Sequence, residues 1–367
     1  MESIADIPAA QWDSLAGSNP FLSHAFLRAL QDSGCATPQT GWRAQFLTFW
    51  QNSDLVGAMP LYLKYHSYGE FVFDRAWAEA YQRHGLRYYP KLLCAVPFTP
   101  VAGLRVLAAS PETRAQLLRT ALRLAQELGV SSLHCLFPDE GQALEMQQEG
   151  MMLRQGVQFH WKNPGYTDFD AYLSCMSHDK RKRIKQERRK VRDAGITFER
   201  IHGEKITEEN WEFFIRCYEN THRQYNSPQP LNLDFFQRIG ATMPENILLI
   251  IALHDGQPIA SALNFYNHDA LYGRSWGAME YHPGLHFETC YYQAIEFCIE
   301  QKIAIFEGGA QGEHKLARGF LPTQTWSAHW LAHDEFVRAV EDFLQRETSS
   351  VTQYVDELNE SNPFKRI

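Results

Sequence analysis

The order of apolar and polar residues along the first half of the chain predicts a series of short strands. Segments 45–50 and 55–63 are rich in apolar and aromatic residues, and the polar segment 51–54 separates them. Two such runs around a short polar turn are typical of a β-hairpin. A third strand is expected near 68–73.

The second half of the chain repeats this pattern. Segments 246–253 and 258–266 flank the polar turn 254–257, and a third strand is expected at 270–277. Each half then continues with an amphipathic helix, a short buried strand and a closing strand that carries a tryptophan. These segments are 112–128, 132–137 and 158–161 in the first half, and 288–301, 303–306 and 327–330 in the second. The repeated order predicts an internal duplication in which each half is closed by its own strand.

The duplication divides the chain into two modules of mixed α/β structure. We expect the first module over 1–157, a connecting segment over 158–195, the second module over 196–340 and a C-terminal helix or tail over 341–367. No Gly-rich phosphate loop joins a strand to a helix in this sequence, so a doubly wound nucleotide-binding fold is not predicted.

Composition excludes two classes of protein. Hydrophobic residues make up 44% of the 367 residues and charged residues 21%, which is the opposite of a disordered chain. The longest apolar run, 247–253, is far shorter than the roughly 20 residues of a membrane-spanning helix. The acidic N-terminus lacks the features of a secretory signal, and the seven cysteines form no Cys-x-x-Cys pair. We therefore expect a cytoplasmic protein with reduced cysteines.

A strongly basic segment stands out because the net charge of the chain is −8. Ile184 and Val191 give this predicted helix a narrow apolar stripe, and Glu187 is its one acidic residue between 180 and 192. It is either a solvated linker helix or a site for a nucleotide, a phosphorylated donor or a tRNA backbone. The concentration of charge favours an anion site. Its basic residues are Lys180, Arg181, Lys182, Arg183, Lys185, Arg188, Arg189, Lys190 and Arg192, of which the first four are our candidate donor- or phosphate-binding residues.

The segment 306–320, Phe-Glu-Gly-Gly-Ala-Gln-Gly-Glu-His-Lys-Leu-Ala-Arg-Gly-Phe, resembles the signature of FemAB-like "peptidoglycan biosynthesis/recognition" proteins. That family is described as predicted N-acyltransferases of the GNAT acyltransferase superfamily. Similar stretches occur up to about residue 335, among them 19–24, 61–64, 67–70, 88–91, 97–100, 159–161, 180–189, 271–274 and 286–288. The resemblance implies an α/β (α+β) protein with tandem GNAT-like acyl-CoA N-acyltransferase folds of the Fem type.

The same resemblance implies an enzyme that moves an acyl or aminoacyl group from an activated donor to an amine of a small molecule or peptide, in peptidoglycan or amino-acid metabolism. GNAT enzymes that use acetyl-CoA generally carry a Q/R-x-x-G-x-G/A loop, and neither 97–103 nor 277–284 contains one. Two donors stay open, an acyl-CoA and an aminoacyl-tRNA that contacts the basic helix. The sequence does not predict the oligomeric state.

The segment 307–318 supplies the residue types that acyl transfer needs. Glu307, Glu313 and His314 are candidate bases, and Lys315 is a fourth catalytic candidate because a cation there would hold a phosphate or carboxylate. The alternative is that Glu307 forms a structural ion pair with Arg318 or Lys315. Candidate substrate-binding residues in the second half are Gln311, Arg318, Glu288, Tyr291, Arg274 and His160, with Glu288 equally suited to stabilise a helix N-terminus by its charge.

In the first half, a polar and aromatic segment follows the predicted hairpin, and Asp74, Trp77 and Lys91 are its candidate substrate-binding residues. Two histidine pairs, His282 with His286 and His329 with His333, have metal-like spacing. One pair spans Pro283-Gly284 and the other begins in a predicted strand, so helical ligand geometry is not expected. We therefore predict no metal cofactor.

Two other classes of function remain as alternatives. The first is a non-catalytic module that recognises a cell-wall precursor or peptide on a degenerate GNAT fold. The second is a nucleic-acid-binding protein that uses the basic helix, for which affinity would fall steeply with salt.

Overall fold

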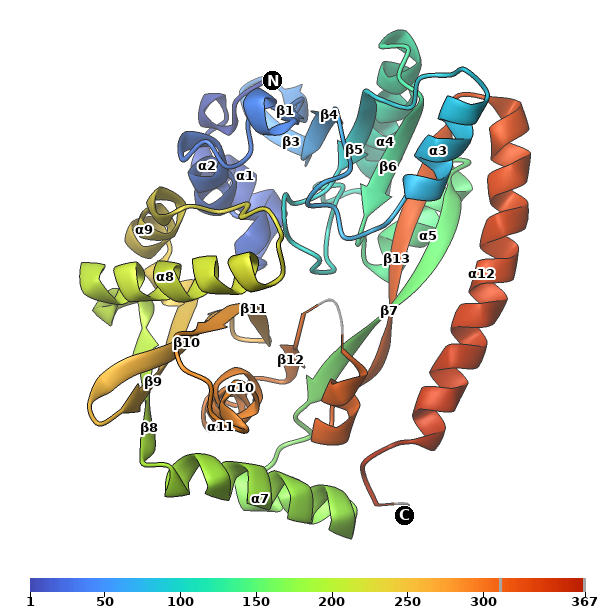
Figure 1. The fold of residues 1–367 in the computed structure, drawn as a ribbon. Helices are drawn as coiled ribbons and strands as arrows, with labels where there is room; N and C mark the ends of the chain where they lie inside the picture. Colours follow the sequence, from blue (N-terminus) through green and yellow to red (C-terminus); the bar gives the residue numbers. More distant parts are fainter. Residues whose placement is uncertain (310–311, 366–367) are drawn as a thin grey trace. The chain divides into compact units, whose positions relative to one another are not determined.

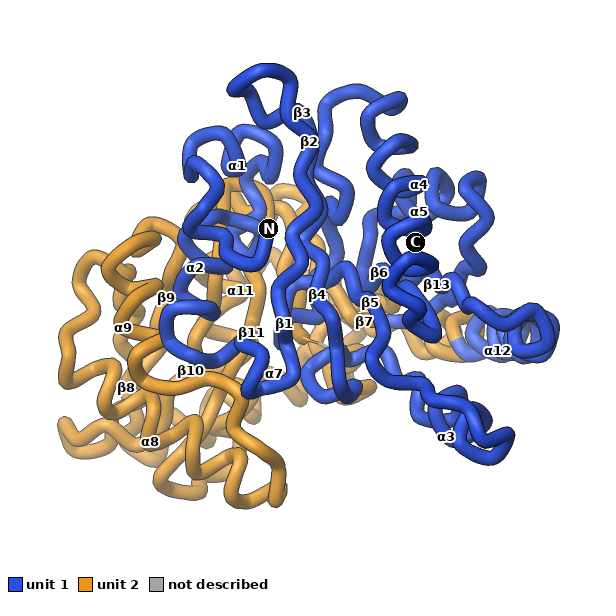
Figure 2. Tube along the Cα trace, turned by 90° about the horizontal axis from the view of Figure 1, so that it is seen from above, with its two compact units in different colours: residues 1–157, 324–354 blue, residues 158–323, 355–367 orange. Residues whose placement is uncertain are grey.

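The computed structural model describes residues 1–309 and 312–365. The chain packs into two compact units, drawn in two colours in Figure 2. Unit 1 comprises residues 1–157 and 324–354, and unit 2 comprises residues 158–323 and 355–367. Each unit thus combines one long stretch of chain with one short segment from nearer the C-terminus.

Unit 1 is built on a mixed sheet (Figure 1). Its strands lie in the order β1 (Trp42–Ala44), β4 (Leu61–Lys64), β5 (Lys91–Cys94), β6 (Ser132–Leu136) and β13 (Leu321–Leu331). β5 and β6 run parallel, and the other neighbouring pairs run antiparallel. A separate hairpin pairs β2 (Leu47–Gln51) with β3 (Asp54–Met59).

Helix α4 (Pro111–Glu127) covers the apolar face of this sheet. Ser110 accepts a hydrogen bond from the Thr113 N–H and Pro111 occupies the first turn, both typical of a helix start. Leu117 and Leu118 lie in one apolar core with Leu92 and Leu133 of the sheet. The other helices are α1 (Ala9–Ala16), α2 (His24–Asp32), α3 (Arg75–Arg83), α5 (Glu140–Gln148) and the part of α12 (Asp334–Glu360) that belongs to unit 1.

Unit 2 has a similar succession of strand directions, with one more antiparallel strand. Its strands lie in the order β7 (Met152–Lys162), β12 (Ile305–Glu307), β11 (Ala270–Ala278), β10 (Gln257–Tyr266), β9 (Ile247–His254) and β8 (Ile196–His202). β11 and β12 are parallel, and all other neighbours are antiparallel. In both units, one parallel pair is therefore followed by an antiparallel closing strand.

Helices lie on both sides of the sheet in unit 2. Figure 1 shows α8 (Glu208–Gln224) on one side of β10 and β11, and α10 (Leu285–Phe287) and α11 (Gln293–Glu300) on the other. A π-helical turn, Glu288–Tyr292, joins α10 to α11. The remaining helices are α6 (Phe169–Cys175), α7 (His178–Asp193) and α9 (Leu233–Thr242), and a 3-10 helix spans Glu313–Arg318. None of the described helices is long and apolar enough to cross a lipid bilayer.

The closing strands are exchanged, which corrects the expectation that each half is closed by its own strand. β13 comes from the second half but pairs with β6, with Ala328 aligned with Cys135. Residues 160–162 of β7 follow the first half but pair with β12, with Trp161 aligned with Phe306. Alternation along a sequence predicts that a strand forms, but it does not determine the partner strand.

Segment 68–73 is not a strand, contrary to the expectation from its residues. Phe71 has a positive φ of 62°, and Tyr68 and Phe73 are 66% and 72% exposed. Gly69 is also left-handed, and a Cβ there would lie 2.4 Å from Phe98 Cδ1. A turn with this close contact replaces the strand, and β5 takes the third-strand position instead.

Candidate active site

Polar side chains line one face of the sheet in unit 2 where β11, β12 and β7 meet. Tyr272 of β11 is aligned with Glu307 of β12, and Glu307 is aligned with His160 of β7 on its other side. Aligned residues of neighbouring strands point to the same face, and so do residues two apart along one strand. Gln158 therefore joins this set, and its Oε1 lies 3.4 Å from His160 Nε2. We call these four residues the Glu307 row.

Glu307 is the last residue of the parallel pairing. β11 continues beyond this point, whereas the chain leaves β12 through Gly308 and Gly309, and Gly309 has a positive φ of 84°. β11 also has a register shift at Arg274, typical of a β-bulge. Bulges redirect side chains and are frequent beside active sites. The end of β12 is therefore a place where two strands part and charged groups gather.

Burial shifts the pKa values of two side chains in or near the Glu307 row, His160 and Arg274. Burial lowers the pKa of His160 to about 4, so its imidazole is neutral near pH 7. The His160 Nε2 atom lies 4.0 Å from Glu307 Oε2. Burial also lowers the pKa of Arg274 to about 10, although Tyr218 and Glu307 oppose this change. A carboxyl group, a neutral imidazole and a half-buried guanidinium are thus combined at one strand end, a set suited to proton transfer and to charge stabilisation.

A buried lysine, Lys315, lies close to the glycine turn that follows β12. Lys315 is 3% exposed, and its Nζ donates a hydrogen bond of 2.9 Å to the carbonyl oxygen of Gly309. Burial lowers the pKa of Lys315 to about 8. A Cβ at Gly308 would lie 3.3 Å from Lys315 Cδ, so the glycine permits this close approach. An ammonium group in such a position is suited to polarise a carbonyl oxygen.

The other candidates of segment 307–318 lie in different surroundings. Glu313 and His314 are exposed, and His314 Nε2 lies 3.1 Å from the hydroxyl of Tyr291.

Cys290 is half-buried, and burial raises the pKa of its thiol, which does not favour a thiolate nucleophile. Gln311 lies outside the described residues.

Arg318 and Glu288 are held in ion pairs with α7. Arg318 Nη2 is 2.9 Å from both carboxylate oxygens of Glu187, and its guanidinium lies 3.3 Å from the ring centre of Phe287. Arg188 Nη2 donates to Glu288 Oε1 at 2.8 Å. Arg318 thus pairs with Glu187. From the sequence, Glu307 had been considered as a possible partner of Arg318. The contacts of Arg318 and Glu288 also fasten α7 to the helices beside it.

A groove of about 1200 Å³ runs along α7 and is bordered by α6, β8 and α11. Lys185 pairs with Asp170, and Arg188 pairs with Glu288 and Glu296. The other four cations of the groove form no ion pair with any residue that the structure describes. They are Arg181, Lys182, Arg189 and Arg192. Of the four predicted phosphate-binding residues, Lys180 and Arg183 do not line the groove, and Arg183 pairs with Glu187.

The predicted substrate-binding residues of unit 1 lie inside a packed ionic cluster. Lys91 is 0% exposed, pairs with Asp74, and donates a 2.7 Å hydrogen bond to Glu70 Oε2. Burial raises the pKa of Glu70 to about 7. Burial also acts to raise the pKa of Asp74, but Lys91, His134 and the hydrogen bonds from Lys91 and Tyr88 together outweigh it and hold this pKa at about 2. Trp77 is 5% exposed and contacts the ring of His329. This cluster is built as part of the core.

Two histidines of this cluster were not predicted to lie together, and His329 was considered only for its metal-like spacing from His333. His134 and His329 are aligned on β6 and β13, and their Nδ1 atoms are 2.7 Å apart. Each accepts or donates a 2.8 Å hydrogen bond to a serine two residues earlier, Ser132 or Ser327. The sequence contains Ser-x-His twice, at 132–134 and 327–329, each within a predicted buried strand. Residues two apart on a strand share one face, so each serine lies beside its histidine.

Comparison with known proteins places the chain in a family. Residues 3–366 match the family model named FemAB-like, described as peptidoglycan biosynthesis/recognition. The chain belongs to the FemAB-like family. A search of curated proteins gives no match to this FemAB-like chain.

Solved structures resemble the FemAB-like chain at low sequence identity. FemX is 11% identical with a TM-score of 0.58, covering 91% of this chain and 98% of FemX. The DUF2156 domain of an Agrobacterium fabrum protein is 9% identical with a TM-score of 0.57 over 95% and 97% of the two chains. L-PGS from Bacillus licheniformis is 10% identical with a TM-score of 0.54 over 88% and 95%. The predicted fold class, an α/β protein with Fem-type tandem GNAT-like folds, is confirmed.

The ionic cluster of unit 1 generates a stability prediction. Replacing Lys91 with Met leaves Glu70 and Asp74 as buried carboxyl groups without their cation, which should lower the free energy of unfolding by about 3–5 kcal/mol. Chemical denaturation followed by tryptophan fluorescence measures this change. The triple variant Glu70→Gln, Asp74→Asn, Lys91→Met removes all three charges and should regain part of the loss. A stability of Lys91→Met equal to that of the wild type would contradict the structural role.

Proposed function

We propose that this FemAB-like protein is an N-acyltransferase that moves an acyl or aminoacyl group to an amine of a peptidoglycan precursor or related peptide. The observation that carries the proposal is the combination of Glu307, His160 and Lys315 around the end of β12. The family description and the Fem-type fold support this class of reaction.

In this reaction, the acceptor amine attacks the carbonyl carbon of the donor and forms a C–N bond. The bond from that carbon to the thioester sulfur or to the ester oxygen breaks, and the leaving group takes up a proton. Glu307 is the proposed base, since it is less exposed than Glu313 and has the neutral imidazole of His160 close to it. Lys315 is the proposed cation that stabilises the negative oxygen of the tetrahedral intermediate.

The groove along α7 is the proposed binding site of the donor. Acyl-CoA and aminoacyl-tRNA both carry phosphates, which clustered lysine and arginine side chains attract. Arg181, Lys182, Arg189 and Arg192 are available for this role because they form no ion pair with the described residues. Neither stretch that corresponds to the usual CoA loop has its glycine pattern, so we favour aminoacyl-tRNA as the donor.

Replacing Glu307 tests the chemistry. Glu307→Gln should lower kcat roughly 10²- to 10⁴-fold, the usual contribution of a general base. The assay measures release of deacylated tRNA or free CoA in the presence of amine-containing precursor peptides. Glu313→Gln is the matched control and should keep nearly all activity. The opposite ranking of the two variants would contradict the assignment, and precursor binding without any turnover would favour a recognition protein.

The lowered pKa of Lys315 predicts the alkaline side of the pH profile. The ammonium is present below its pKa of about 8 and is lost as the pH rises through that value. The kcat of the wild type should therefore fall above about pH 8. Lys315→Arg keeps the positive charge at higher pH, so its residual activity should not show this fall. An unchanged alkaline limb in Lys315→Arg would assign the titration to another group.

Neutralising the groove tests the donor site. Arg181→Gln with Lys182→Gln should weaken tRNA binding and reduce the slope of log affinity against log salt by about 1.4, the expectation for two lost contacts to single-stranded phosphates. Lys180→Gln with Lys190→Gln is the control, because it removes the same charge from positions outside the groove. Equal losses in both variants would contradict a specific site. Binding of acyl-CoA but not of tRNA, lost in the first variant alone, would make the thioester the donor.

A further inference from the structure

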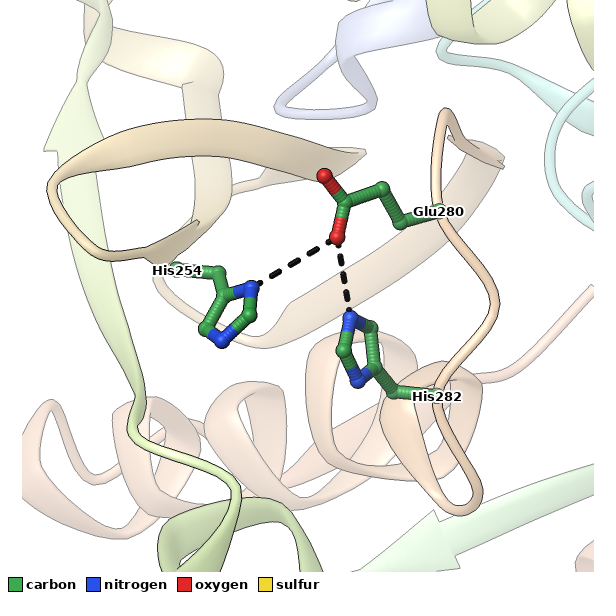
Figure 3. Close-up of side chains that lie close together, drawn as sticks. All are labelled: His254, Glu280 and His282. Carbon is green, nitrogen blue, oxygen red and sulfur yellow. Dashed lines mark hydrogen bonds and ion pairs between the residues drawn. The ribbon is translucent and has the colours of Figure 1, made fainter.

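Three side chains with metal-binding atoms converge at one end of the sheet in unit 2. Figure 3 shows His254, from the end of β9, beside Glu280 and His282, from the loop after β11. Glu280 Oε2 lies 3.5 Å from His254 Nδ1 and 3.0 Å from His282 Nε2. The three ligand atoms all lie within 4.8 Å of one another. His282 therefore lies with His254 in this cluster, and not with His286, the residue four positions along the chain that has metal-like spacing from it.

The separations are close to those of a zinc site. Ligand bonds of about 2.0–2.1 Å in a tetrahedron place neighbouring ligand atoms about 3.3 Å apart. Two of the three separations, 3.0 and 3.5 Å, lie on either side of this value, and the third, between the two histidines, is within 4.8 Å. Small side-chain movements would therefore suffice to direct all three atoms at one ion.

The types of ligand atom indicate which metals this site could bind. Two imidazole nitrogens and one carboxylate oxygen suit Zn²⁺ and related transition metals, whereas Mg²⁺ and Ca²⁺ prefer sites made of oxygen. The Glu280 side chain is 51% exposed, and those of His254 and His282 are 32% and 20% exposed. An ion can reach these atoms without unfolding of the chain.

We propose that His254, Glu280 and His282 form a binding site for one Zn²⁺ ion, with the fourth coordination position open to water. The ion would join the end of β9 to the loop after β11. That loop leads through Gly284, which has a positive φ of 91°, into α10 and the turn that contains Glu288. A bound ion would therefore hold the segment that precedes Glu288 against the end of β9. The site contains none of the residues assigned to acyl transfer.

Zinc binding to the purified full chain tests this site. Isothermal titration with ZnCl₂ should give one tight site per chain, and Zn²⁺ but not Mg²⁺ should raise the Tm. His254→Gln and Glu280→Gln should each lower the affinity at least tenfold. The matched control is His268→Gln, because His268 forms a single exposed pair with Asp269, 2.9 Å apart. This control should bind as the wild type does.

A second measurement separates this site from binding by cysteine. Cys175 is exposed and is a competing ligand for soft metals. The visible spectrum of bound Co²⁺ should show tetrahedral coordination without a thiolate charge-transfer band, and Cys175→Ser should leave it unchanged. Absence of a tight site in the wild type, equal affinity in the wild type and His254→Gln, or a spectrum dominated by thiolate would each overturn the proposal. Circular dichroism of the metal-free variants checks that they are folded.

Discussion

The parallel pairing of β11 with β12 lasts for three aligned residues, and this short pairing places Glu307 at the end of a strand. A longer β12 would keep the two strands joined and would bury Glu307 within the ladder. Instead, the strand ends at Glu307, and Gly308 with Gly309 turns the chain away. Groups from both sides then approach one point: His160 from β7, and Lys315 through its hydrogen bond to Gly309.

Helix α7 owes its position to charge pairs as much as to apolar packing. Only Ile184 and Val191 of this helix are buried, which is little apolar area for sixteen residues. Glu187 and Arg188 add contacts to Arg318, Glu288 and Glu296 across the helical layer. Glu187 and Arg188 thus hold the helix in place. Arg181, Lys182, Arg189 and Arg192 form no ion pair with the described residues and are left for solvent or for a ligand. The anchors thus explain how a helix with so few apolar residues can present a fixed charged surface.

Local pattern predicted much of the fold, because hairpins and amphipathic helices are encoded by neighbouring residues. It also predicted Glu307 at the end of a buried strand, followed by a glycine turn. The exchange of β7 and β13 was not predictable in this way, because strand pairing is a long-range choice. The same limit affected the site. Asp74 and Lys91 have the composition of a ligand-binding segment, and their buried ion pair forms between residues 17 positions apart, which local pattern does not predict.

The two units carry different polar side chains on their parallel strands and closing strands. In unit 1, His134 lies on the parallel strand and is aligned with His329 on the antiparallel closing strand. In unit 2, Glu307 lies on the parallel strand β12 and is aligned with His160 on the antiparallel closing strand β7. β6 continues for two residues beyond His134, and both histidines are 1% exposed, whereas β12 stops at Glu307. Each unit therefore pairs a polar residue of a parallel strand with a histidine of its antiparallel closing strand. In unit 1 the strand continues and the histidine pair is part of a hydrogen-bonded core, whereas in unit 2 the strand ends at Glu307 and two glycines follow it.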